Sequence, residues 1–335
     1  MKKMFLFTSI IFIVFFFSCK DIVVTEPESN QNVADFEAAW KRIKDVYPYL
    51  EFKKINWDSI YTVYRPQAEQ AKGDEFYLVL RDFLAELKDG HVYYRTLGGA
   101  KVYPYYPRRH FKDRHAYSPF VVRKYFDREL QLTVSKSIEY EILPGNIGYA
   151  FLSDFHEDYL TNEFPEVLEY LKNTKALILD IRQKRGGAYH NIEAVVTRFL
   201  SQPLERNDMY LYGEKLDFPP YQPQGPFQYT NPVVVLINGS TFSAGEFTTE
   251  ILKQLPQVTA VGDTTGGGSV GSGDEGLYFL PSGKSMEIGY YDFRRYDGLP
   301  WEWLGVPPDI LVEQTEADIL AGHDKQLEYA ISILK

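Results

Sequence analysis

Residues 238–250, NGSTFSAGEFTTE, decide how this chain is interpreted. They follow the apolar run VVVLI at 233–237 and open a segment with helical character. A continuous apolar run ended by a Gly-containing turn indicates a buried strand that leads into a helix. Ser243 stands where that helix is expected to begin.

Ser243 has two interpretations. In the first it is a helix cap, because S-x-x-E with Glu246 forms a capping box. In the second it is a nucleophile at the edge of a sheet, where helix N–H groups favour a developing negative oxygen and Ala244 and Gly245 leave room for a carbonyl. The motif alone favours the cap, since a nucleophilic serine also needs a base and an oxyanion hole.

The pattern around this stretch predicts an α/β fold. From residue 146, apolar strands such as KALILDI and NPVVVLI alternate with helical segments, which is typical of a sheet buried between helices. Residues 33–90 show helical spacing and form an N-terminal helical subdomain. Residues 91–145 form a β-rich connecting segment, in which we expect strands at HVYYRTL, FVVRKYF, ELQLTVSK and IEYEIL. Residues 146–335 form the core.

The N-terminus has the features of a targeting segment. Residues 1–18 combine MKK with an apolar stretch too short to span a membrane comfortably, and Cys19, the single cysteine, follows directly. We expect a lipoprotein signal peptide, lipidation at Cys19 and a polar tether over 19–32. The alternative is an ordinary signal peptide with an incidental cysteine. The first interpretation predicts an exported, membrane-anchored lipoprotein of the cell envelope, with the outer membrane as its expected location.

Composition excludes several classes of function. The 335 residues carry a net charge of −10 without a basic stripe, so we expect no nucleic-acid partner. The six histidines are scattered, so we expect no metal. The Gly-rich stretch TTGGGSVGSGDEG at 264–276 lacks G-K-[ST], and we expect no cofactor.

Two further motifs accompany Ser243. In LILDIRQKRGGAYH, residues 177–190, a buried strand leads to Gly186 and Gly187, where the backbone can approach a ligand closely and turn an N–H inward. In LKDGHV, residues 87–92, His91 follows the end of a helix. Each motif taken alone is more typical of an ordinary turn or a solvent-facing histidine.

Taken together, the motifs DGH, IGYAFLSDF, LDIRQKRGG, NGSTFSAGE, GDTTGGG and GVPPDI resemble the C-terminal processing (tail-specific) serine peptidase family, in its tricorn-core-like branch. The resemblance covers about residues 35 to 335. It implies a crotonase/ClpP-like α/β catalytic core and a peptide or protein substrate. It leaves the oligomeric state open.

The resemblance also implies site residues. Ser243 is the nucleophile, and Ala244 supplies one oxyanion N–H. The Gly186–Gly187 turn supplies the other, with Gly187 favoured over Gly186. His91 is the general base, since imidazole with a pKa near 6.5 suits proton transfer at neutral pH.

The sequence departs from the family in three places. The lysine that one branch carries in G-K-G after the serine is absent, because this position reads TTGGGSVG. The tricorn-like branch holds its histidine through a serine and a glutamate, whereas here Gly90 precedes His91. Glu302 is the matching carboxylate, with a surface carboxylate as the equal alternative. Many members carry a PDZ domain, but the segment between HVYYRT and IEYEIL is too short for one, so we expect none.

Arg108 and Arg109 stand in a Tyr- and Pro-rich loop. Arginine can clamp a carboxylate in two-pronged fashion, so a site for a peptide C-terminus is one hypothesis, and a solvated charged loop is the other. Two further interpretations of the whole chain remain at this point. One is a catalytically inactive relative that binds peptides or other ligands as a lipoprotein, and the other is an acyl-CoA enzyme on the related crotonase fold.

Overall fold

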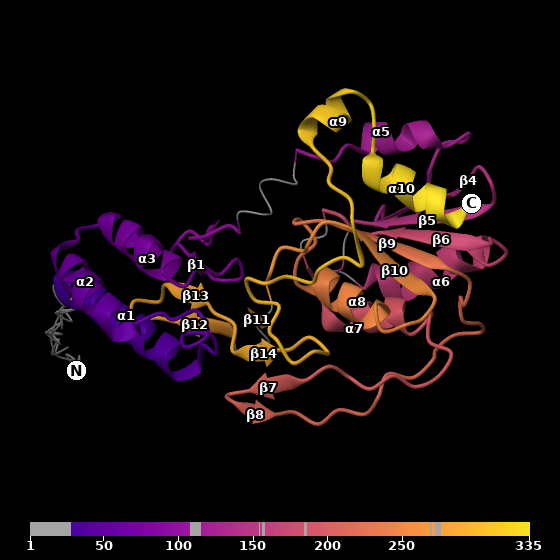
Figure 1. The fold of residues 1–335 in the computed structure, drawn as a ribbon. Coiled ribbons are helices and arrows are strands. Elements are labelled where there is room, and N and C mark those ends of the chain that lie inside the picture. Colours follow the sequence, from indigo (N-terminus) through magenta and orange to yellow (C-terminus); the bar gives the residue numbers. More distant parts are fainter. Residues whose placement is uncertain are drawn as a thin grey trace, which may run out of the picture.

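A computed structural model describes residues 28–107, 115–153, 155, 158–183, 186–268, 270–271 and 276–335 (Figure 1). Within these residues the main sheet has seven strands in the order β15-β10-β9-β6-β5-β4-β3. The strands span β3 (Gln131–Leu132), β4 (Ile138–Leu143), β5 (Ile147–Leu152), β6 (Ala176–Asp180), β9 (Val233–Ile237), β10 (Val258–Gly262) and β15 (Ile310–Leu311). Strands β15 to β5 run parallel, and β4 and β3 are antiparallel to their neighbours.

Helices cover both faces of this sheet, as Figure 1 shows. One face packs against α6 (Tyr159–Leu171), α7 (Tyr189–Val196) and α8 (Ala244–Leu252). The other face packs against α5 (Pro119–Val122) and α10 (Lys325–Leu334). Every residue of β6 and β9 is buried because both faces are covered, which explains their unbroken apolar sequences. The predicted α/β fold is confirmed.

The N-terminal helices form a second core of their own. They are α1 (Glu28–Val46), α2 (Trp57–Gln70) and α3 (Glu75–Ala85). Their apolar faces pack against a four-stranded sheet of order β12-β13-β1-β2. Its strands are β1 (Tyr93–Arg95), β2 (Lys101–Val102), β12 (Leu277–Phe279) and β13 (Ser285–Glu287).

Strand β1 joins the two halves of the chain. It follows the helical unit in sequence, yet it pairs antiparallel with β13 of the predicted core, with Tyr93 opposite Glu287. The loop that precedes β1 is thereby fixed against the C-terminal half of the chain. A second small sheet, of order β11-β14-β7-β8, lies beside this junction (Figure 1). Its strands are β7 (Met209–Leu211), β8 (Glu214–Lys215), β11 (Val270–Gly271) and β14 (Tyr291–Phe293).

The structure corrects two local expectations. Residues 120–126, predicted as a strand, form the end of α5 and the 3-10 turn η1 (Arg123–Tyr125). Pro119 starts this helix with its fixed φ, and Val122 is buried against the main sheet. In addition, α1 begins at Glu28, inside the predicted tether. Asn32 is buried there and donates from Nδ2 to Ala71 O at 3.1 Å, which docks this end of the helix onto α2.

The remaining elements agree with the expected pattern. The described chain ends in α9 (Glu316–Leu320) and α10, and the predicted hairpin at 276–289 is formed by β12 and β13. No helix in the described residues is long and apolar enough to cross a bilayer. The predicted signal peptide and Cys19 lie outside the described residues.

Candidate active site

Ser243 lies in a strained turn between β9 and α8. Its backbone has φ of 54° and ψ of −116°, a conformation that residues with a Cβ rarely adopt. Ser243 and Glu246 have the capping-box arrangement, but the hydrogen bond of good geometry runs from Ser243 N–H to Glu246 Oε2 at 2.9 Å. The Ser243 hydroxyl forms no cap hydrogen bond of this quality. A capping role therefore does not account for the strained serine.

Glu246 holds the serine turn to the Gly-rich loop. Besides Ser243 N–H, its carboxylate accepts from Thr265 Oγ1 at 2.5 Å, from Gly267 N–H at 2.7 Å and from Gly268 N–H at 2.8 Å. The side chain is fully buried. Glu246 thus fixes two segments that are more than a helical turn apart in sequence, and the conformation of Ser243 depends on it.

Glu246 predicts a pH dependence of stability. Burial raises the pKa of its carboxyl from 4.5 to about 7, against the opposing effect of its hydrogen bonds. The folded protein therefore keeps a proton that the unfolded chain releases. The stabilisation of the fold by the protonated Glu246 carboxyl is complete below a pH of about 4.5 and is lost as the pH rises through about 7. The shift corresponds to about 3 kcal/mol.

We expect Glu246→Gln to remove this part of the pH dependence. Urea unfolding at about pH 5 and about pH 8 gives, for each protein, the change in free energy of unfolding with pH. This change should be smaller in the variant than in the wild type. The variant should also be less stable overall, because an amide cannot accept hydrogen bonds through both of its terminal atoms. The same change in free energy of unfolding with pH in both proteins would contradict the assignment of this pH dependence to Glu246.

The Gly186–Gly187 turn lies against Ser243. A Cβ built on Gly186 would lie 3.0 Å from Ser243 Cβ and 3.3 Å from Ser243 Oγ. A Cβ on Gly187 would lie 2.1 Å from the carbonyl carbon of Phe155, with which Gly187 forms a parallel bridge. Both glycines have positive φ, 125° and 149°. Only glycine fits both positions.

Three backbone N–H groups in the segments next to Ser243 have no partner among the described residues. Among the described residues, the N–H groups of Ala244, Gly186 and Gly187 form no hydrogen bond within the protein. Ala244 N–H belongs to the first turn of α8, where N–H groups have no partner within the helix. The Gly186–Gly187 turn and Ala244 thus lie next to Ser243, while their role as oxyanion donors and the choice between Gly186 and Gly187 stay predictions.

The end of β6 is anchored by a buried arginine. Arg182 Nε and Nη2 donate to the two oxygens of Asp180 at 3.0 and 2.7 Å, and Nη1 donates to Asp324 Oδ1 at 2.8 Å. Tyr149 OH donates to Asp180 Oδ2 at 2.9 Å. All four side chains are buried. This network fixes the strand that leads into the Gly186–Gly187 turn.

His91 lies next to the Ser243 turn. Its ring stacks on Phe242, the neighbour of Ser243, with 4.6 Å between ring centroids. Both ring nitrogens are shielded and have no hydrogen-bond partner among the described residues. The structure thus brings His91 to the serine turn without a hydrogen bond between the two side chains.

The charges around His91 come from three residues. Burial lowers the pKa of its imidazole below 6.5, and the nearby Lys53 cation acts in the same direction. Asp89 and Glu287 oppose this lowering. Asp89 is the closest, with 3.8 Å between His91 Nδ1 and Asp89 Oδ1. The imidazole is therefore neutral, and able to accept a proton, at neutral pH.

Gly90 leaves space for the Phe242 ring. A Cβ at residue 90 would lie 2.9 Å from Phe242 Cζ and 3.0 Å from Pro107 Cδ. Gly266 and Gly268 line the same slot, since their Cβ atoms would lie 2.8 and 2.1 Å from ring atoms of Phe242. A serine before His91, as in the family resemblance, would overlap this ring.

Gly90→Ser is therefore expected to lower the free energy of unfolding by about 1–3 kcal/mol, the usual cost of overpacking. Gly98→Ser is the matched control, because the nearest atom to its Cβ would be 3.7 Å away. Thermal unfolding of both variants measures the effect. Equal, small shifts in both would show that the slot can expand to take a side chain.

Glu302 is buried, which excludes the surface alternative. It is 1% exposed, and its Oε1 pairs with Lys53 Nζ at 2.6 Å. Sequence reasoning missed Lys53, and it also missed Asp89 and Tyr47, which lie in the same cluster. The only signal in the sequence was Asp89 within the DGH motif.

Two family models match this chain, one over the α/β core and one over the N-terminal helices. The model described as Peptidase family S41 matches residues 146–312, and the model described as Tricorn protease C1 domain matches residues 30–85. The chain belongs to peptidase family S41.

Sequence relatives of this S41 chain are proteases as well. A carboxy-terminal-processing protease of Bartonella bacilliformis is 26% identical over 216 residues, covering 57% of this chain and 44% of the relative. Tricorn protease homolog 1 of Streptomyces coelicolor is 31% identical over 161 residues, covering 48% of this chain and 14% of the relative. The chain thus spans less than half the length of these curated relatives.

A solved structure shares the fold over most of its length. The crystal structure of a proposed peptidase from Parabacteroides merdae has a TM-score of 0.77 and 25% identity. The match covers 92% of this chain and 97% of that chain. The helical unit and the α/β core of this S41 chain therefore occur together in a related protein.

The other predicted site residues are not placed. Arg108 and Arg109 lie outside the described residues, so the carboxylate-site hypothesis stays a prediction. In the described part of the chain no group of three or more His, Cys, Asp or Glu side chains is arranged to hold a metal ion.

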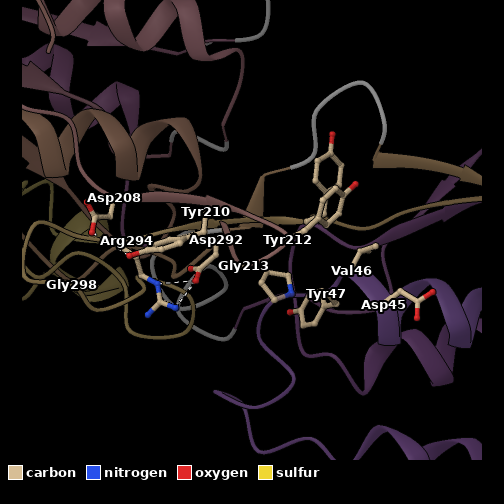
Figure 2. A pocket seen from close by; sticks show the side chains of 12 residues that line it. Asp45, Val46, Tyr47, Asp208, Tyr210, Tyr212, Gly213, Asp292, Arg294 and Gly298 are labelled. Atoms are coloured by element: carbon tan, nitrogen blue, oxygen red, sulfur yellow. Dashed lines mark hydrogen bonds and ion pairs between the residues drawn. The ribbon is translucent and has the colours of Figure 1, made fainter. Parts of the chain in front are cut away.

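A cavity of about 510 Å³ lies where the helical unit meets the small sheet of β7 and β14. Figure 2 shows Tyr210 and Arg294 on one side and the end of α1 on the other. Arg294 Nε donates to Asp292 Oδ2 at 2.9 Å within this wall. Tyr47 lines the same cavity, so the cavity borders the cluster around Lys53.

Proposed function

We propose that this protein is a serine endopeptidase that hydrolyses peptide bonds through an acyl-enzyme on Ser243. The observation that carries the proposal is the strained Ser243 turn, which lies beside three backbone N–H groups without partners among the described residues and beside the buried ring of His91. A serine nucleophile needs these two neighbours, an oxyanion site and a base. Membership of a peptidase family supports peptides or proteins as substrates.

In the proposed mechanism, Ser243 Oγ attacks the carbonyl carbon of the scissile bond while His91 takes the hydroxyl proton. Ala244 N–H and an N–H of the Gly186–Gly187 turn hold the oxyanion. His91 then gives the proton to the leaving amine, which leaves an acyl group on Ser243. Water, activated by His91, releases the acyl group and restores the serine. Catalytic hydrogen bonds are often absent without substrate, so the unbonded ring nitrogens are compatible with this role.

Glu302 has an indirect part in this proposal. Its buried carboxylate contacts the cluster that holds the His91 loop, through Lys53. We expect it to stabilise the loop position during proton transfer.

The proposed setting is the cell envelope, with the protein held at the membrane by a lipid on Cys19. The signal-like segment and its cysteine support this setting. Cys19→Ala should move the protein from the membrane fraction to the soluble fraction of cells. A variant that remains in the membrane fraction would exclude the lipid anchor.

The second candidate is a catalytically inactive relative that binds peptides or other ligands. The lack of a hydrogen bond between His91 and Ser243 among the described residues favours it, because a pair already bonded without substrate would instead favour catalysis. Hydrolysis of an unfolded protein such as casein separates the candidates, measured with and without prior treatment with a fluorophosphonate. We expect cleavage that this reagent abolishes. Binding of casein without cleavage by the folded protein would favour the second candidate.

A further inference from the structure

Lys53 is a fully buried cation that takes no direct part in the proposed proton transfers. It lies in the turn between α1 and α2, and none of its side chain is exposed. Its ammonium contacts Glu302 Oε1 at 2.6 Å, Tyr47 OH at 2.7 Å and Leu87 O at 2.8 Å. An ammonium has three N–H donors, so these contacts use all of them. Lys53 is therefore placed as a fixed cation and not as the base that a serine–lysine pair would need.

Asp89 connects this cation to His91. Tyr47 OH donates to Asp89 Oδ2 at 2.7 Å, and Lys53 Nζ lies 3.9 Å from the same oxygen. The other oxygen, Oδ1, accepts from His91 N–H at 2.8 Å. Asp89 is 1% exposed. The backbone of His91 is thus held by a carboxylate whose own position is fixed by Tyr47 and Lys53.

On its other side, Lys53 contacts the segment that holds the Gly-rich loop. Trp301 Nε1 donates to Gly268 O at 3.1 Å, and Trp303 N–H donates to Gly267 O at 3.0 Å. Glu302, between these tryptophans, carries the carboxylate paired with Lys53.

The Gly-rich loop in turn reaches the serine. Gly267 and Gly268 donate to Glu246, which accepts from Ser243 N–H. Trp303 Nε1 also donates to Lys88 O at 3.0 Å, in the loop that precedes His91. The His91 loop is therefore linked to the Ser243 turn by hydrogen bonds, by the Lys53–Glu302 ion pair and by the backbone of residues 301–303.

We propose that Lys53 is a positioning residue for His91, which links the His91 loop to the Glu302 segment and so sets the histidine relative to Ser243. This inference rests on the proposed serine peptidase function. The residue acts across the junction of the two halves of the chain, because Lys53 comes from the helical unit and Glu302 from the core. A displacement of about 1 Å at a catalytic group costs about 10²-fold in rate, so the link affects chemistry directly.

A second ion pair across the same junction provides the matched control. Lys284 Nζ contacts Asp35 Oδ2 at 3.2 Å and likewise joins α1 to the turn between β12 and β13. Asp35 is fully buried, as Glu302 nearly is. This pair forms no hydrogen bond to the His91 loop, so its loss removes a similar link without acting on the histidine.

The experiment compares Lys53→Met/Glu302→Gln with Lys284→Met/Asp35→Asn. Each pair of substitutions removes both charges together, because a single one would leave a buried charge unpaired. Lys53→Met and Glu302→Gln are also made singly to complete a double-mutant cycle. The measured quantity is the second-order rate of fluorophosphonate labelling of Ser243 across pH, with thermal unfolding as the test of folding.

We expect the Lys53→Met/Glu302→Gln variant to label about 10- to 100-fold more slowly than the wild type at the plateau. The control variant, Lys284→Met/Asp35→Asn, should label within about twofold of the wild-type rate. The two single variants should lose about as much as the pair, since the residues act as one link. The groups that act on His91 are Asp89, Glu287 and Lys53. Loss of the Lys53 cation should therefore shift the rising limb of the pH profile toward higher pH.

The inference is overturned if the Lys53→Met/Glu302→Gln variant labels at the wild-type rate with an unchanged pH profile. It is also overturned if the control pair loses as much, because both links would then be merely structural. Should the Lys53 variants not fold, the His91 pKa is compared by imidazole NMR in folded Ser243→Ala and Ser243→Ala/Glu302→Gln proteins. A changed pKa supports the link and an unchanged one removes it. A folded wild type that does not label defeats the proposed function itself, which is a separate outcome.

Discussion

Replacing His91 with alanine is expected to lower kcat/KM for peptide hydrolysis by about 10²- to 10⁴-fold, the usual contribution of a general acid–base group. The imidazole is the only titratable side chain that stacks on the residue next to Ser243 in the described part of the chain. Without it, the serine hydroxyl must lose its proton to water. The loss should fall on kcat, because the ring carries no proposed substrate contact.

The pH profile gives this prediction a second readout. Because burial lowers the pKa of His91, the midpoint of the rising limb of the wild-type rate should lie below pH 6.5. The limb should disappear in His91→Ala. His190→Ala is the control, since that exposed ring pairs with Asp158 on the surface. A His91 variant with wild-type activity would place the base elsewhere.

Replacing Arg182 with methionine is expected to destabilise the fold by about 3–5 kcal/mol, the cost of leaving buried charges unpaired. Arg182 is fully buried, and its loss would strand both Asp180 and Asp324. Because β6 leads into the Gly186–Gly187 turn, the variant should also displace the proposed oxyanion donors, even where it folds.

Urea unfolding measures this effect against a surface pair. Arg123 contacts Glu139 at 2.8 Å, but its side chain is 44% exposed. Arg123→Met is therefore expected to cost only about 0–1 kcal/mol. A loss in Arg182→Met no larger than in Arg123→Met would mean that the two aspartates find other partners or take up protons.

The strand–turn–helix around Ser243 was predictable from the sequence because its signals are local. VVVLI is apolar throughout, which only a strand covered on both faces tolerates, and SAGE places small residues and an acidic group in the first turn of the next helix. The Gly186–Gly187 pair was predictable for a similar reason. Its positive φ and close approach to Phe155 demand glycine at both positions.

The surroundings of His91 were not predictable, because they depend on contacts distant in sequence. Lys53 and Glu302 belong to different halves of the chain, and only the pairing of β1 with β13 brings those halves together. Gly90 looked like a missing serine, yet it leaves space for the Phe242 ring. Residues 120–126 have strand-like composition, but Pro119 and the burial of Val122 produce a helix instead.

Covalent labelling distinguishes a reactive Ser243 from a serine that only caps a helix. Folded wild-type protein and folded Ser243→Ala are treated with a fluorophosphonate, and the modified residue is located by mass spectrometry. We expect a single adduct on Ser243 in the wild type and none in the variant. A folded wild type without an adduct, or with the adduct on another residue, would contradict it and leave Ser243 as the cap of a strained turn.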